Sequence, residues 1–147
     1  MVLGDSISQG SSGDYTWRYR LYSYLRSENL TPTYVGPYTD LFDIVADHRN
    51  FADHSYADPA FDQHHDAIWG RTLAEAKDTI EPEVARSRPD YLLVLIGIND
   101  LVTDPTNTAG AAANLRALIA NARAADPHLR FVLGQLLPNV RTQLDPS

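Results

Sequence analysis

A serine stands six residues into the chain, in the stretch Gly4-Asp5-Ser6 that follows a short apolar run. A serine directly after a buried strand lies near backbone N–H groups without a partner, and these groups can donate hydrogen bonds to an anion. Ser and Asp also satisfy N–H groups in ordinary turns. The stretch lacks the Gly-Lys-Ser/Thr ending of a phosphate loop, and Ser8 stands where a G-x-S-x-G nucleophile elbow needs glycine. Taken alone, it supports a nucleophile and a structural turn equally.

Two further positions offer hydrogen-bond donors. Asn99 lies in Gly97-Ile98-Asn99-Asp100, directly after an apolar run, and its side-chain amide can donate to an oxyanion. Gly70 precedes an expected helix, and without a side chain it lets a substrate oxygen approach its N–H closely. Each position taken alone is better explained by local structure: an Asx turn at Asn99 and a helix entry at Gly70.

Taken in order, these three sites resemble the Ser, Gly and Asn blocks of the SGNH/GDSL hydrolase family, and the resemblance covers nearly the whole chain. Gly4-Asp5-Ser6 and Gly97–Asp100 are the specific blocks. The resemblance implies a serine ester hydrolase of the esterase, lipase or carbohydrate acetylesterase type. Ser6 would be the nucleophile, and the N–H groups of Ser6 and Gly70 with the Asn99 side chain would form the oxyanion hole. It also implies small-molecule ester or acylated carbohydrate substrates, with no cofactor and no metal.

The family's fourth block, Asp-x-x-His, supplies the general base and the carboxylate that orients it. Nothing after Leu137 matches this block. The stretch from Asp62 to His65 has the right spacing, but it lies in a long loop ahead of Gly70, and we do not expect His65 to reach Ser6. We therefore expect the sequence to be a fragment and a poor esterase by itself. No H-E-x-x-H helix supports metal binding by the loop histidines, so a solvated polar loop is expected there.

The elements that must position these residues follow from hydrophobic periodicity and caps. The expected strands span 1–3, 33–35, 91–97 and 130–137, and the third is expected to be buried on both faces. The expected helices are 15–27 capped by Asp14, a segment from Leu73 capped by Thr72, and 108–125. Pro82 is expected to break or kink the second of these helices, or to start a second turn at Glu81–Ser87. The intervening stretch 40–69 has no regular pattern.

This alternation predicts one domain over 1–147 with a flavodoxin-like three-layer α/β/α fold. Its parallel sheet would have four strands and lack the family's usual fifth, which leaves strand 131–137 as a bare apolar edge. Ligands bind beyond the carboxyl ends of such strands. We hypothesise that the loop 40–66 forms one wall of a substrate cleft beyond these strand ends. Trp17 and Trp69 are candidates to line it, whereas Leu21 and Tyr22 are expected in the core.

The amino-acid composition argues against several classes of function. The chain has 12 Lys and Arg against 19 Asp and Glu, a net charge of −7, which argues against nucleic-acid binding. It has no cysteine, which excludes thiol catalysis and Cys-ligated zinc. No segment approaches the ~18 apolar residues of a membrane span, and no signal peptide is visible. The sequence leaves the cellular compartment undetermined, and both a secreted and a cytoplasmic protein fit it. A non-catalytic binding or scaffolding domain of the same fold is the main alternative. A flavin or nucleotide binder is a third, against which the absent glycine-rich phosphate loop argues.

Overall fold

The computed structural model describes residues 1–46, 48–49 and 56–136. In chain order its elements are β1 (Val2–Gly4), α1 (Ser6–Gln9), α2 (Trp17–Ser27), β2 (Phe42–Asp43), β3 (His48–Arg49), β4 (Asp66–Ala67), α3 (Leu73–Ser87), β5 (Tyr91–Leu95), α4 (Ile98–Thr103), α5 (Thr108–Ala125) and β6 (Arg130–Leu133).

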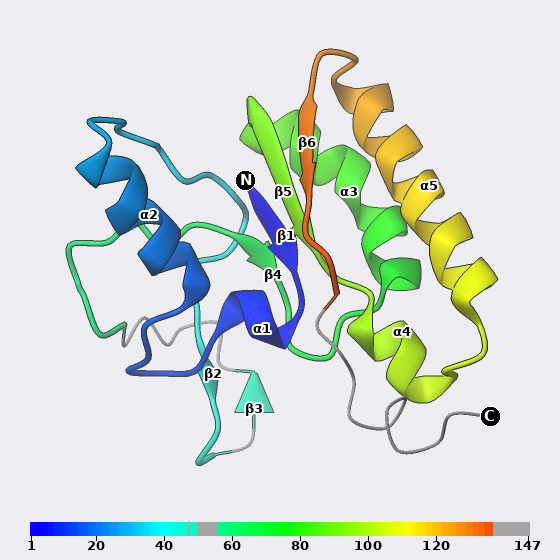
Figure 1. Cartoon of the computed structure of the whole chain (residues 1–147), viewed down its shortest axis with the longest axis horizontal. Helices are drawn as coiled ribbons and strands as arrows, with labels where there is room; N and C mark the ends of the chain where they lie inside the picture. Colours follow the sequence, from blue (N-terminus) through cyan, green and yellow to red (C-terminus); the bar gives the residue numbers. More distant parts are fainter. Residues whose placement is uncertain (47, 50–55, 137–147) are drawn as a thin grey trace.

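A four-stranded parallel sheet with the strand order β4-β1-β5-β6 forms the middle layer. Helices α3 and α5 cover one face of the sheet and α2 lies over the other (Figure 1). The short strands β2 and β3 form a separate antiparallel pair. The predicted three-layer α/β/α fold with four parallel strands is therefore confirmed.

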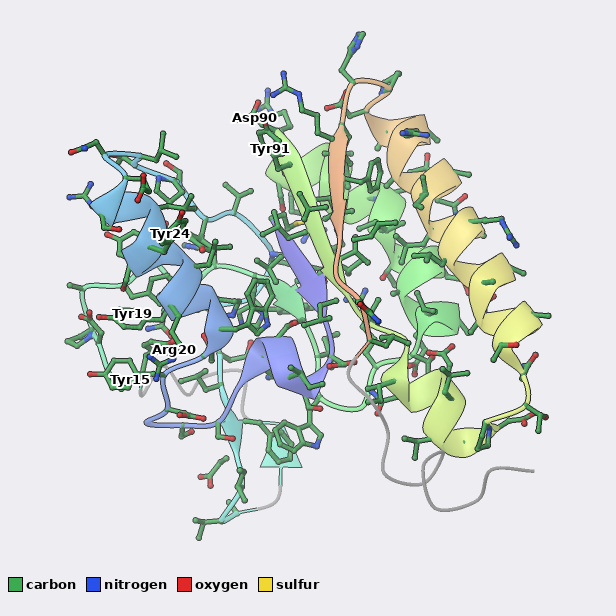
Figure 2. All side chains as sticks on the ribbon, in the orientation of Figure 1. Tyr15, Tyr19, Arg20, Tyr24, Asp90 and Tyr91 are labelled. Atoms are coloured by element: carbon green, nitrogen blue, oxygen red, sulfur yellow. The ribbon has the colours of Figure 1, made fainter. Side chains whose placement is uncertain are left out.

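Two apolar cores lie on opposite faces of the sheet, because successive strand residues point to opposite sides. Leu3 and Val94 face α3 and α5, whereas Val2 and Leu93 face α2. The second core is largely aromatic, with rings from Tyr19, Tyr22, Tyr34, Tyr56 and Phe61 in mutual contact. Tyr22 thus packs in the core as predicted. Tyr24 of α2, labelled in Figure 2, is exposed.

The second strand position was predicted wrongly. Residues 33–35 form no strand, and the strand beside β1 is β4, inside the stretch that lacked a regular pattern. The segment around Tyr34 is held by a side chain instead, since its hydroxyl donates to the Arg18 carbonyl oxygen at 3.0 Å. Because β4 is only Asp66-Ala67, without a β-branched or alternating pattern, it gives no periodic signal.

The start of α2 also differs from the prediction. Thr16 is its N-cap, with a side chain that accepts from the Tyr19 N–H. Asp14 lies outside the helix, and its carboxylate accepts from the neighbouring Tyr15 N–H at 2.7 Å. Both residue types are good caps, so the sequence alone could not choose between them.

Helix α3 runs unbroken through Pro82, contrary to the predicted break. Pro82 and Asp78 are both exposed, so water can reach the Asp78 carbonyl that the missing N–H leaves unbonded. Ile80 and Val84 are buried on the opposite side and hold the helix on the sheet. At its start, Thr72 forms the predicted cap as part of a capping box with Glu75.

The carboxyl-terminal half follows the predicted pattern with two differences. Helix α5 has the predicted bounds. Strand β5 is buried only on the α3 and α5 face, because Leu93 and Leu95 on its other face are partly exposed. Strand β6 ends at Leu133, and the last residue of the predicted strand, Leu137, lies outside the described residues.

Candidate active site

The parallel register brings the three candidate residues to one edge of the sheet. Gly4 of β1 pairs with Ala67 of β4 on one side and with Leu95 of β5 on the other. Ser6, Gly70 and Asn99 each follow one of these paired residues by a short step along the chain. Figure 1 shows α1 and α4 both at this end of the sheet.

Ser6 is the first residue of the single-turn helix α1 rather than part of a loop. Asp5 caps this turn, since its Oδ1 accepts from the Ile7 N–H at 3.0 Å. Burial raises the pKa of Asp5, and its backbone hydrogen bonds oppose that shift. Gly4 is needed because a Cβ there would lie 2.3 Å from Ser8 Oγ. The Gly-Asp-Ser stretch therefore folds the chain sharply out of β1 and leaves Ser6 partly exposed.

Gly70 is the exposed residue of a tight turn between β4 and α3, with a φ of +78° that favours glycine. The Ile68 N–H donates to the Gly4 carbonyl oxygen at 3.2 Å, and the Arg71 N–H donates to the Ile68 carbonyl at 3.1 Å. The turn is thus attached directly to the strand that precedes Ser6.

Asn99 belongs to α4 and reaches the Gly70 turn. Its Nδ2 donates to the Arg71 carbonyl oxygen at 2.9 Å. Its neighbour Asp100 accepts from the Leu73 N–H at 2.8 Å, at the first turn of α3. Both polar residues of the Gly97–Asp100 motif therefore bind the chain that follows β4.

The structure also identifies two residues of this site that the sequence interpretation missed. Gln9 and Arg18 are completely buried, and both hold the carboxyl end of α1. The Arg18 guanidinium donates to the carbonyl oxygens of Ser8, Gln9 and Gln63 at 2.6, 3.0 and 2.8 Å. Burial lowers its pKa to about 10. No motif or spacing signals this role, because each contact joins segments that are distant in sequence.

His65 is completely buried, so the predicted solvated polar loop is wrong at this residue. Its Nδ1 accepts from the Ala67 N–H at 3.0 Å, which leaves Nε2 to carry the proton and donate to the Asp40 carbonyl oxygen at 2.9 Å. Burial lowers the pKa of His65 to about 3, with a smaller contribution from the charge of Arg18. A neutral ring with both nitrogens occupied is not a general base for Ser6.

The described rings of His64 and His128 form no hydrogen bond with Ser6. His64 Nδ1 pairs with Asp62 Oδ1 at 2.6 Å, and a little under half of each side chain is exposed. His128 precedes β6, at the far end of the sheet from α1 (Figure 1). Within the described part of the chain, no side chain hydrogen-bonds to the Ser6 hydroxyl.

The first part of the loop 40–66 lies on the Ser6 side of the sheet. The Phe42 N–H donates to the Gly10 carbonyl oxygen at 3.0 Å, just after α1. The Phe42 ring stacks on Trp69, beside Gly70, with ring centroids 4.1 Å apart. Trp17 donates from Nε1 to Ser8 Oγ at 3.2 Å. Residues 47 and 50–55 of this loop lie outside the described residues.

Two further properties concern the described residues as a group. They contain no cluster of three or more His, Asp or Glu side chains arranged to hold a metal ion. None of their helices is sufficiently long and apolar to span a bilayer.

Solved structures with the same fold include carbohydrate esterases. A family 3 carbohydrate esterase from Clostridium thermocellum matches with a TM-score of 0.72 and 22% identity, over 97% of this chain and 63% of that one. A carbohydrate esterase family 3 structure from Talaromyces cellulolyticus matches with a TM-score of 0.70 and 24% identity, over 90% and 59%. A mutant acetyl esterase with an acetate ion gives a TM-score of 0.70 and 23% identity, also over 90% and 59%. The chain thus spans about three fifths of the length of these structures, and at such identities the likeness establishes the fold.

The sequence itself gives the family. No curated protein matches the chain. The model of the GDSL-like lipase/acylhydrolase family matches residues 2–147, which is nearly the full sequence. The chain belongs to the GDSL-like lipase/acylhydrolase family.

Proposed function

We propose that this chain is a serine ester hydrolase in which Ser6 is the nucleophile. The N–H groups of Ser6 and Gly70 and the Asn99 side chain form its oxyanion hole. One observation carries the proposal: the Asn99 amide donates to Arg71, directly after Gly70, at 2.9 Å. This bond connects the third motif with the Gly70 turn, which is itself bonded to Gly4 through Ile68. Membership of the GDSL-like lipase/acylhydrolase family supports the same assignment.

The chemistry follows from these positions. Ser6 Oγ attacks the carbonyl carbon of an ester, and the carbonyl oxygen becomes an oxyanion. The Asn99 Nδ2 carries two hydrogens, and the bond to Arg71 uses one, so the second is available to the oxyanion. The tetrahedral intermediate then expels the alcohol and leaves the acyl group on Ser6, from which water releases it. A general base must take the Ser6 proton in the first step.

The proposed substrates are acetyl esters, in particular acetylated carbohydrates. The solved structures with this fold are described as carbohydrate esterases and as an acetyl esterase with bound acetate. In this chain, Trp69 and Phe42 form a stacked aromatic pair beside Gly70. The partly exposed Trp69 ring beside Gly70 suits the apolar face of a sugar ring.

We also propose that residues 1–147 by themselves acylate slowly. His65 is neutral and bonded through both ring nitrogens, and the His64 ring forms no hydrogen bond with Ser6. Without a base positioned at Ser6 among the described residues, the oxyanion hole and Ser6 give modest catalysis. An added base such as imidazole should then accelerate acylation.

The test measures p-nitrophenyl acetate cleavage and the acetyl group on the protein by intact mass. We expect slow acetylation that rises with imidazole concentration, disappears in Ser6→Ala and persists in Ser27→Ala, which removes an exposed serine hydroxyl of α2. Rapid turnover without imidazole would contradict the proposed slow rate. No acetylation at any imidazole concentration would favour a non-catalytic binding domain.

A further inference from the structure

Gln9 is a completely buried side chain at the end of α1. Its Oε1 accepts from the Trp69 N–H at 2.6 Å, and its Nε2 donates to Asp40 Oδ2 at 2.7 Å. A backbone N–H only donates and a carboxylate only accepts, so these partners determine which way the amide points. The side chain is therefore held at both ends.

These contacts connect the two segments that carry the backbone donors. Gln9 shares the single turn of α1 with Ser6, and Trp69 directly precedes Gly70. The Ser6 and Gly70 segments leave different strands, β1 and β4. A one-turn helix and a tight turn have few internal bonds, so their relative position depends on contacts between them.

Neighbouring bonds fix the remaining freedom of both segments. Arg18 holds the backbone carbonyl of Gln9 at 3.0 Å, so the start of the glutamine side chain is fixed. On the other side of Gly70, Asn99 holds the Arg71 carbonyl at 2.9 Å. Gly70 is therefore held from both sides, through Trp69 by Gln9 and through Arg71 by Asn99.

We propose that Gln9 is a positioning residue that sets the spacing between the N–H groups of Ser6 and Gly70, so that both reach the same oxyanion. The inference rests on the function proposed above. Gln9 acts through Trp69 and touches no reacting atom, so its loss should lower the maximal acylation rate and leave substrate binding unchanged. A misplacement of about 1 Å in such a site can cost about 10²-fold in rate.

Two variants test the bond to Trp69. Gln9→Met keeps the length of the side chain and removes both hydrogen bonds. The exchanged pair, Gln9→Glu with Asp40→Asn, keeps an acceptor for the Trp69 N–H and reverses the direction of the bond to residue 40, with the net charge unchanged. The control is Asn121→Leu, which removes a side-chain amide bond to the Lys77 carbonyl oxygen, between α5 and α3.

The kinetic experiment measures cleavage of p-nitrophenyl acetate in the presence of imidazole. It gives the maximal rate and the substrate concentration at half-saturation. Gln9→Met should lower the maximal rate about 10²-fold, with the half-saturating concentration nearly unchanged. The exchanged pair should recover most of this loss, and Asn121→Leu should keep the wild-type rate. A wild-type rate in folded Gln9→Met, or no recovery in the folded exchanged pair, overturns the proposal. If Gln9→Met does not fold, Gln9→Asn replaces it, because it keeps the amide and shortens its reach by one methylene.

A second readout needs no catalysis. The backbone ¹⁵N–¹H signals of Trp69 and Gly70 should shift and broaden in Gln9→Met, return in the exchanged pair and stay in place in Asn121→Leu. Unchanged signals in Gln9→Met overturn the proposal. Loss of the proposed function is detected separately, as absent acetylation of the wild-type protein, and the Gly70 signal then still decides whether Gln9 positions this turn.

Discussion

Asn99 connects two parts of the site through one side-chain amide, and this gives a residue-scale prediction. Its bond to the Arg71 carbonyl fixes the Gly70 turn, and its second N–H is the proposed oxyanion donor. Removing one such donor typically costs about 10²–10³ in rate. Asn99→Ala should therefore lower the imidazole-assisted acylation rate by about that factor, measured with p-nitrophenyl acetate.

The matched control is Asn121→Ala. Asn121 also donates from Nδ2 to a backbone carbonyl, that of Lys77, at 2.7 Å, but between α5 and α3. This variant should lose stability and keep its acylation rate. Equal rate losses in the Asn99 and Asn121 variants would contradict a catalytic role for Asn99.

His65 gives a second prediction at the residue scale, on pH. Its pKa is about 3 in the folded protein, mainly because of burial, against an ordinary value of 6.5. Between these values the unfolded chain binds a proton that the folded chain does not, so stability falls as the pH falls below about 6.5. The slope from one such group reaches about 1.4 kcal/mol per pH unit.

His65→Gln isolates this dependence. The glutamine amide can replace the bonds to Ala67 and to the Asp40 carbonyl, and it does not titrate. The carboxyl groups titrate in both proteins, whereas residue 65 titrates only in the wild type. Urea unfolding from pH 7 to pH 4 should therefore show the wild-type free energy of unfolding falling more steeply than that of the variant. A constant difference between the two proteins over this range would rule out a neutral, buried His65.

At the scale of elements, α1 is too short to be stable by itself and depends on α2. Arg18 of α2 satisfies the carbonyls of Ser8 and Gln9 at the end of α1 and that of Gln63. An unsatisfied buried acceptor costs about 1–3 kcal/mol, so Arg18→Met should lower the free energy of unfolding by about 3 kcal/mol or more. Arg18→Lys should lose most of this too, since an ammonium cannot reproduce the planar fork.

Arg20 provides the control on the same helix. It is exposed on α2 (Figure 2), and Arg20→Lys should change the unfolding free energy by less than about 0.5 kcal/mol. Urea denaturation measures all three variants. A loss in Arg18→Lys no larger than in Arg20→Lys would mean that the three carbonyl contacts contribute little.

At the scale of the whole molecule, β6 is an edge strand of the described sheet with apolar residues half in solvent. Val132 and Leu133 are 52% and 51% exposed. An apolar edge can pair with another chain, and a charge on it prevents this. Val132→Lys should therefore reduce concentration-dependent self-association, measured by sedimentation velocity.

Val45→Lys introduces the same charge at a residue that is 97% exposed and outside the four-stranded sheet. It should leave self-association close to that of the wild-type protein. Equal reductions in the two variants would attribute the effect to net charge rather than to the β6 edge.

The sequence by itself determined the elements whose signal is local. Helix α5 and the start of α3 carry periodic apolar residues and caps within a few residues of one another, and β5 is a continuous apolar run. The Ser, Gly and Asn blocks could be identified because each is a short motif at the end of an element. Local patterns also misled, since Pro82 breaks a helix only where packing does not hold it.

The tertiary structure alone decided how these motifs are held together. Strand β4 forms because the edge of β1 presents backbone N–H and C=O groups that can pair with an adjacent segment of any sequence. The two residues of β4 therefore need no strand propensity of their own. Gln9, Arg18 and His65 gained their roles from burial and from hydrogen bonds to distant backbone groups. Such contacts depend on three-dimensional proximity, which a single sequence does not encode in any local pattern.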